Sequence, residues 1–129
     1  MLKESIICVV IVVAIVFGNN VTQSYTKETV SELTSELIIL REDMTNQEMD
    51  HEKAQKEIKE IYEQWEERHD KLAYFIEHDE LEKVETGLIS VKSYIESKQY
   101  EDSIDELDKS IFILQHIEDK YAFNLQNIF

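Results

Sequence analysis

The chain has 129 residues, 28 acidic against 13 basic side chains, and a formal net charge of −15. Phosphate binding needs clustered Lys and Arg, so this charge argues against a nucleic-acid partner. With no proline, two glycines and one cysteine, the chain has few turn formers, no internal disulfide and none of the glycine-rich loops that hold phosphates. The composition predicts an all-α protein.

An unbroken apolar run covers residues 6–17, behind a short polar head. Residues 5–21 give about 25 Å of helix at 1.5 Å per residue, which nearly spans the hydrocarbon core of a bilayer. Such a segment at the N-terminus is typical of a signal anchor or a secretory signal. We expect a retained membrane helix at residues 1–21 and an extracytoplasmic domain at residues 22–129; cleavage near Gly18 and secretion is the alternative.

The charges that flank this run predict its orientation. Lys3 and the amino terminus precede it, and the first basic residue after it, Lys27, is next to Glu28. Basic flanks tend to stay in the cytoplasm. We therefore expect a single-pass protein of the cell membrane with a cytoplasmic N-terminus.

Apolar residues at steps of three and four predict four helices after the anchor. They cover residues 26–44, about 48 or 51 to 77, about 80–95 and 100–121. Short connections favour an antiparallel up-down helical bundle, with three helices including one long stalk helix as the alternative. Gly87 lies inside the third helix, where its missing side chain would permit close helix contact.

Two capping boxes predict where helices begin. Thr45 with Glu48 marks the start of the second helix, and Asp79 with Glu82 marks the start of the third. The apolar face of each helix then predicts the core of the bundle. The predicted core residues of the last three helices are Ile58, Ile61, Trp65, Leu72, Phe75, Leu81, Val84, Leu88, Val91, Ile104, Leu107, Ile111 and Leu114, and the first helix adds Val30, Leu33, Leu37, Leu40 and Met44.

The histidines are the only residues that suggest metal chemistry. His51-Glu52 begins like the zinc-protease motif H-E-x-x-H, but Gln55 stands at the second ligand position. Two pairs, Glu48 with His51 and Glu66 with His69, have the E-x-x-H spacing of di-iron bundles, yet glutamate is so abundant that chance matches are expected. We therefore predict no catalytic, metal-binding or cofactor-binding residues and no enzyme activity.

The last residues of the chain are unusually apolar for a terminus, which is normally polar and frayed. They either fold back over the end of the bundle or dock on another protein. Candidate interaction residues are Leu125, Asn127, Ile128 and Phe129.

The N-terminal anchor, Trp65, the FIEHDELEKVE stretch at residues 75–85, the paired helices after it and the ending Asn127-Ile128-Phe129 together resemble the bacterial family called domain of unknown function 4363. The resemblance implies a small single-anchored protein of Gram-positive, often spore-forming bacteria without an assigned activity. It also implies an accessory role beside a polytopic membrane protein.

We therefore expect a non-enzymatic, membrane-anchored interaction or accessory protein that binds a membrane protein through a helix face or its C-terminus. The alternative is an extracytoplasmic ligand-sensing four-helix bundle that acts through a partner. Homo-oligomerisation through coiled-coil seams stays open.

Overall fold

The computed structural model describes residues 1–46 and 50–128, apart from the side chains of residues 19, 20, 22, 23 and 121–128. Four helices make up nearly all of it: α1 (Leu2–Thr45), α2 (His51–Leu72), α3 (His78–Glu96) and α4 (Tyr100–Ile128). No strand occurs within these ranges. The all-α prediction is confirmed.

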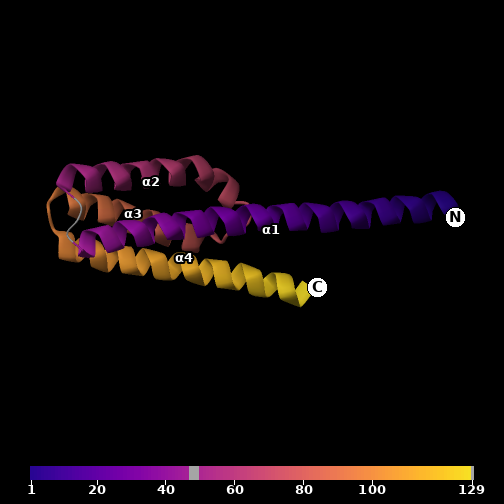
Figure 1. The fold of residues 1–129 in the computed structure, drawn as a ribbon. Coiled ribbons are helices and arrows are strands. Elements are labelled where there is room, and N and C mark those ends of the chain that lie inside the picture. The colour runs from indigo at the N-terminus through magenta and orange to yellow at the C-terminus, as the bar shows by residue number, and fades with distance from the viewer. Residues whose placement is uncertain (47–49, 129) are drawn as a thin grey trace.

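The helices form a bundle in which consecutive helices run in opposite directions (Figure 1). α1 packs against α2 and α4, and α3 packs against the same two helices. Each helix therefore occupies one corner of the bundle, and the short connections place consecutive helices side by side. α1 and α2 are separate helices rather than one long stalk.

The first helix is much longer than the other three. α1 has 44 residues, and its N-terminal part projects far beyond the bundle (Figure 1). The predicted boundary between residues 21 and 22 falls inside this one helix, which passes Gly18 without interruption. A single glycine costs a helix only about 1 kcal/mol, and no proline is present to break it.

The observed helix caps differ from both predicted capping boxes. Asp50 caps α2 and accepts a hydrogen bond from the backbone N–H of Lys53 at 2.7 Å. Thr45 is instead the last residue of α1, and its hydroxyl donates to the carbonyl of Arg41 within the same helix. Glu48 lies outside the described residues.

The third helix also begins earlier than its capping box predicted. Glu77 is at the N-cap position without a side-chain cap, and Asp79 lies inside the first turn of α3. An acidic side chain in the first turn still interacts favourably with the helix dipole. The observed N-cap, Glu77, therefore lies two residues before the predicted one, Asp79.

All four helices contribute to one apolar interior. Trp65 is the largest side chain in it, with 1% of its surface exposed. The structure buries these predicted core residues: Val30, Leu33, Leu37, Leu40, Ile58, Ile61, Trp65, Leu72, Leu81, Val84, Leu88, Val91, Leu107, Ile111 and Leu114.

Three residues predicted for the core, Met44, Phe75 and Ile104, are only partly buried. Because α2 ends at Leu72, Phe75 lies in a turn, and Ile76 is the buried residue there. On α4 the buried line includes Ser103 and Ser110, which the hydrophobic pattern does not detect, so Ile104 falls beside the line rather than on it.

The serines accompany a close approach of α3 and α4. A Cβ added to Gly87 would lie 2.4 Å from Oγ of Ser110 and 3.6 Å from its Cβ. The absent side chain of Gly87 therefore lets the two helices approach, as its position in the third helix predicted.

Candidate interaction surfaces

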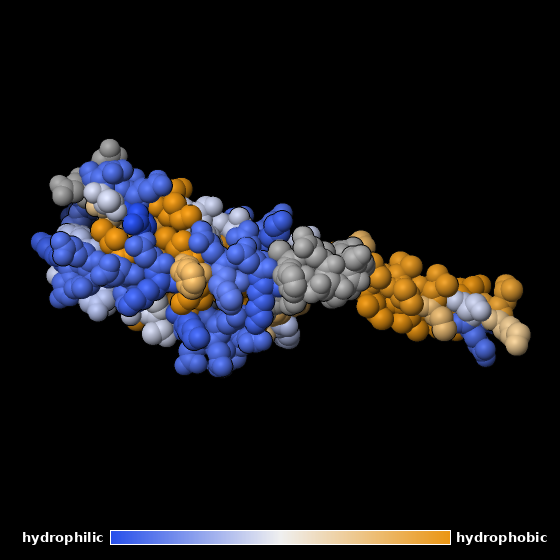
Figure 2. Space-filling model, turned by 90° about the horizontal axis from the view of Figure 1, so that it is seen from below, coloured by the Kyte–Doolittle hydropathy of each residue, from blue (hydrophilic) through white to orange (hydrophobic). Residues whose placement is uncertain are grey.

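The most exposed apolar surface of the protein is the projecting part of α1. Between residues 6 and 17 its large apolar side chains are 37–69% exposed. Figure 2 shows this part as an apolar rod that leaves the hydrophilic surface of the bundle. A helix that is apolar on all sides normally lies in a protein core or a membrane.

To cross a membrane, a helix must be long and apolar enough to span the hydrocarbon core, which exposure of its side chains does not by itself show. Among the residues that the structure describes, no helix is both long enough and apolar enough to cross a membrane.

The surface of the bundle carries open hollows. One of about 440 Å³ lies between α3 and α4, where Gly87 and Ser110 contribute to its lining. Another of about 250 Å³ lies between α1 and α2 and is lined by Glu36, Glu57 and Glu60 among others.

Glu57 is a partly buried acidic residue in the α1–α2 hollow. Burial raises the pKa of its carboxyl group, and the nearby charge of Asp43 raises it further. Both α1 and α2 contribute carboxylates to this hollow, so two acidic helix surfaces face each other there. This arrangement disfavours a further anion in the hollow.

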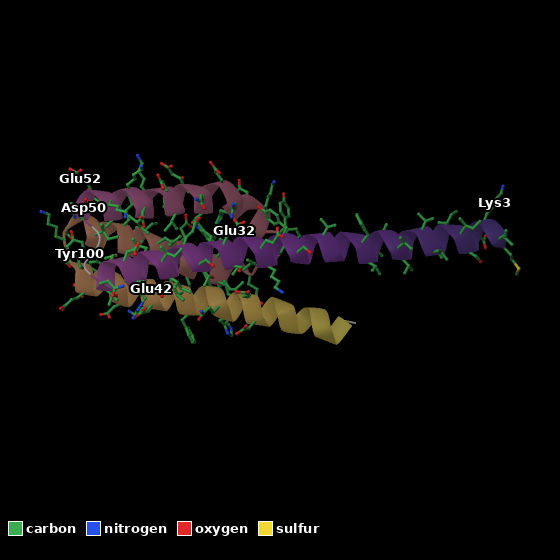
Figure 3. The ribbon with its side chains drawn as sticks, viewed as in Figure 1. Lys3, Glu32, Glu42, Asp50, Glu52 and Tyr100 are labelled. Atoms are coloured by element: carbon green, nitrogen blue, oxygen red, sulfur yellow. The ribbon has the colours of Figure 1, made fainter. Side chains whose placement is uncertain are left out.

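The histidines singled out in the sequence have structural partners. Nδ1 of His51 lies 2.6 Å from the hydroxyl of Tyr100, and the two rings meet edge to face. This contact joins the starts of α2 and α4 at the end of the bundle that lies away from Lys3 (Figure 3). His69 packs edge to face on Trp65, with ring centroids 5.8 Å apart.

Of the two E-x-x-H pairs, only Glu66 with His69 lies wholly within the described residues, and it is not part of a group that could hold a metal ion. Glu48 lies outside the described residues. Glu66 interacts with Tyr62 instead: burial raises the pKa of Tyr62, and a hydrogen bond with the Glu66 carboxylate raises it further. Within the described ranges no three His, Cys, Asp or Glu side chains are placed to hold a metal ion. His78 and His116 are both exposed.

Ion pairs connect the helices around the outside of the bundle. Arg68 Nη1 of α2 lies 2.7 Å from Glu32 Oε2 of α1, and Arg41 of α1 pairs with Asp108 of α4. These pairs are partly or largely exposed, so each contributes little to stability. They favour the observed neighbours over other pairings.

Lys120 of α4 links the last helix to the turn before α3. Its ammonium nitrogen lies 3.1 Å from Glu77 Oε1 and 3.3 Å from Glu80 Oε1. Hydrogen bonds to these two carboxylates raise the pKa of Lys120. The contact places the turn at residues 73–77 against α4.

The predicted interaction residues at the C-terminus are not described in atomic detail. α4 continues to Ile128, while the side chains of Leu125, Asn127 and Ile128, and all of Phe129, lie outside the described residues. Both interpretations of the apolar ending therefore stay predictions.

Sequence reasoning missed two exposed aromatic residues of the bundle, Tyr74 and Phe112, of which Phe112 on α4 is 71% exposed. Tyr74 is 83% exposed, in the turn that follows α2. The signal for it was an aromatic pair, Tyr74-Phe75, placed just before the start of a new helix rather than inside one.

The fold and these surfaces define an acidic up-down four-helix bundle that carries an uncovered apolar extension on its first helix. The chain belongs to the family described as Domain of unknown function (DUF4363), whose sequence model matches residues 20–128. No curated protein and no solved structure matched the chain.

Proposed function

We propose that this protein is a non-enzymatic accessory subunit, held in the cell membrane by residues 5–21, whose extracytoplasmic bundle binds a polytopic membrane protein. The observation that carries the proposal is the exposed apolar surface of α1. Its large apolar side chains from Ile6 to Phe17 are 37–69% exposed, and this part of α1 projects beyond the bundle (Figure 1). A bilayer is the environment that removes such a surface from water.

The length of the segment suits a short membrane helix. Residues 5–21 extend about 25 Å, against about 30 Å for an average hydrocarbon core. A helix shorter than the core is accommodated by local thinning of the bilayer at a modest cost per ångström. Because α1 continues into the bundle as one helix, the anchor and the bundle are connected without a flexible linker.

The charge distribution supports the orientation with the bundle outside the cell. Lys3 precedes the apolar segment, while the bundle that follows is strongly acidic. Basic residues that flank a membrane helix tend to stay on its cytoplasmic side, whereas acidic residues have little influence on the orientation.

The binding role follows from what the side chains of the bundle do. His51 and His69 contact Tyr100 and Trp65, and the hollows on the surface are open. A rigid scaffold with an apolar ending suits recognition of another protein better than chemistry. The family resemblance adds the kind of partner, a polytopic membrane protein.

The anchor is tested by placing charge on the apolar extension. Arginine near the middle of a membrane helix costs about 2.5–3.5 kcal/mol per residue in insertion. The variant Ile11→Arg/Ile15→Arg should lose the protein from carbonate-washed membranes. The matched control is Ile39→Arg/Ile89→Arg, two isoleucines of the bundle that are 55% and 49% exposed, and it should stay with the membranes.

The partner is tested by purification from native membranes in mild detergent. An affinity tag inserted in the connection between α1 and α2 leaves the C-terminus free, and mass spectrometry identifies what is recovered. A stoichiometric polytopic protein is expected, and deletion of residues 127–129 should abolish its capture while circular dichroism shows an unchanged bundle. Recovery of the protein alone would contradict the accessory role.

A further inference from the structure

The two ends of the bundle have turns of opposite character. At the end away from the apolar extension, the chain turns at Asn46, at Asp50 and through Ser97-Lys98-Gln99, which are polar residues. At the end that faces the extension, α2 and α3 are joined through residues 73–77, in which the apolar stretch Ala73-Tyr74-Phe75-Ile76 precedes Glu77. Figure 1 shows this connection on the side of the bundle from which the first half of α1 projects.

The structure places the apolar turn close to the start of the extension. Nζ of Lys71, in the last turn of α2, lies 5.7 Å from the ring centroid of Tyr25 on α1. Tyr25 follows Val21 by about one helical turn, or about 6 Å along the axis of α1. The turn is therefore near the level at which the proposed membrane helix leaves the hydrocarbon core.

The side chains of the turn divide between the core and the outside. Ile76 is buried, with 4% of its surface exposed, while Tyr74 is 83% exposed. The rings of Tyr74 and Phe75 lie against each other, with centroids 6.3 Å apart. The bundle thus buries Ile76, covers Phe75 in part and leaves Tyr74 facing outward.

The turn is also held in place rather than free. The backbone N–H groups of Tyr74 and Phe75 donate to the carbonyls of Lys71 and Leu72 at 3.2 and 2.9 Å. On the other side, Lys120 of α4 binds Glu77 at 3.1 Å. The aromatic pair is presented at a defined height by α1, α2 and α4 together.

From this arrangement we propose that Tyr74 and Phe75 lie in the headgroup layer of the bilayer, as a second membrane contact besides α1. The inference rests on the proposed anchor. The headgroup layer is about 5–7 Å thick on each side, and tyrosine is enriched there because its ring is apolar and its hydroxyl is polar. The rise from Val21 to Tyr25 matches this thickness.

The charges around the turn indicate which lipid surface it fits. Glu77 and Glu80 both pair with Lys120, and the ammonium group of Lys71 lies over the ring of Tyr25. Two lysines beside two carboxylates do not make the basic cluster that selects anionic lipids. A zwitterionic surface such as phosphatidylcholine is sufficient. Two contacts separated across the bundle then fix its tilt, which a single helix leaves free to vary.

The test uses the full-length chain in phosphatidylcholine nanodiscs with a fluorophore sensitive to its surroundings. Cys8 is the only cysteine, so the native protein labelled there reports on the anchor. Cys8→Ala/Tyr74→Cys carries the label in the turn, and Cys8→Ala/Ser97→Cys carries it in the opposite turn as the matched control. Lipids with a nitroxide in the headgroup or the acyl chain supply the quencher.

We expect the label at position 74 to shift to shorter wavelength and to be quenched by the headgroup nitroxide, while the label at position 97 shows neither change. A label at position 8 that is quenched while the label at position 74 behaves like that at 97 would overturn the inference and leave the anchor intact. If neither position 8 nor position 74 is quenched, the proposed anchor itself is wrong. A shift at position 74 in native membranes but not in nanodiscs would also overturn the inference, in favour of contact with a protein.

Discussion

The two halves of α1 have the same backbone conformation and opposite surroundings. Residues 6–17 expose apolar side chains on all sides, whereas the half within the bundle buries one face and exposes polar residues on the other. Leu37 is fully buried, while Ile11 is 52% exposed. An amphipathic stripe is covered by the other helices of its own chain, but a helix that is apolar all round must find cover elsewhere.

The largest expected effect comes from the aromatic centre of the bundle. Trp65→Ala should lower the free energy of unfolding by about 3–5 kcal/mol, because a buried aromatic side chain leaves a cavity that its neighbours fill only partly. Urea denaturation followed by circular dichroism measures the change. Phe17→Ala, an aromatic residue in the projecting half of α1 with 69% exposure, is the control and should leave the unfolding of the bundle unaltered.

A second pair of variants tests the comparison within α1 itself. Leu37→Ala should destabilise the bundle by about 2–5 kcal/mol, while Ile11→Ala should change its stability by less than about 0.5 kcal/mol. Both are measured in detergent by the same denaturation. Equal losses for the two variants would mean that the projecting half is packed against protein, contrary to the structure.

The close contact between α3 and α4 allows a test of what the buried hydroxyl group of Ser110 costs the bundle in stability. Oγ of Ser110 is buried and has no hydrogen-bond partner among the described residues, so Ser110→Ala should stabilise the bundle by about 1 kcal/mol. Gly87→Ala alone should gain little or lose stability, because its Cβ meets this hydroxyl at 2.4 Å.

Combining the two changes removes the clash and leaves the alanine with its helix-forming advantage of about 1 kcal/mol over glycine. The double variant should therefore be more stable than the sum of the single variants predicts, as measured in a double-mutant cycle. Strict additivity would show that the two positions do not touch.

The smallest effect concerns the acidic surface between α1 and α2. The pKa of Glu57 is raised in the folded protein by burial, so its ionisation opposes folding above that pKa. This penalty fades as the pH falls through the folded pKa and is absent below the ordinary pKa of an unfolded glutamate.

Glu57→Gln should therefore raise the stability at pH 7 by no more than about 0.5 kcal/mol, and the advantage should disappear on acidification. Thermal melts at several pH values measure the difference. Glu67, an exposed residue of the same helix, provides the control variant Glu67→Gln, which should show no such gain. A gain that grows as the pH falls would have the wrong sign.

The part of α1 within the bundle also shows why most of the helices and buried residues could be predicted from the sequence. The four helices and most of their buried faces followed from apolar spacing, because a helix that packs on one side must repeat apolar residues every three or four positions. Trp65 and Leu37 were placed correctly for this reason. Membership in the DUF4363 family, which the resemblance suggested, is confirmed.

The misplaced residues lie where the helices end. Thr45 and Asp79 match a capping pattern, but Asp50 and Glu77 hold the cap positions. Capping residues are common in an acidic, threonine-containing chain, and a local pattern does not say which candidate is used. Phe75 was assigned to the core because α2 was extended past its true end at Leu72.

The sequence by itself determined the helical class, the acidic surface and the uncovered apolar run, because these follow from composition and from repeats within a few residues. Only the tertiary structure decided that α1 is one helix through both regions, that Ser103 and Ser110 occupy the interior, and that Ile76 rather than Phe75 is buried while Tyr74 faces outward. These features depend on how closely neighbouring helices approach and where each one stops, and packing between distant segments sets both.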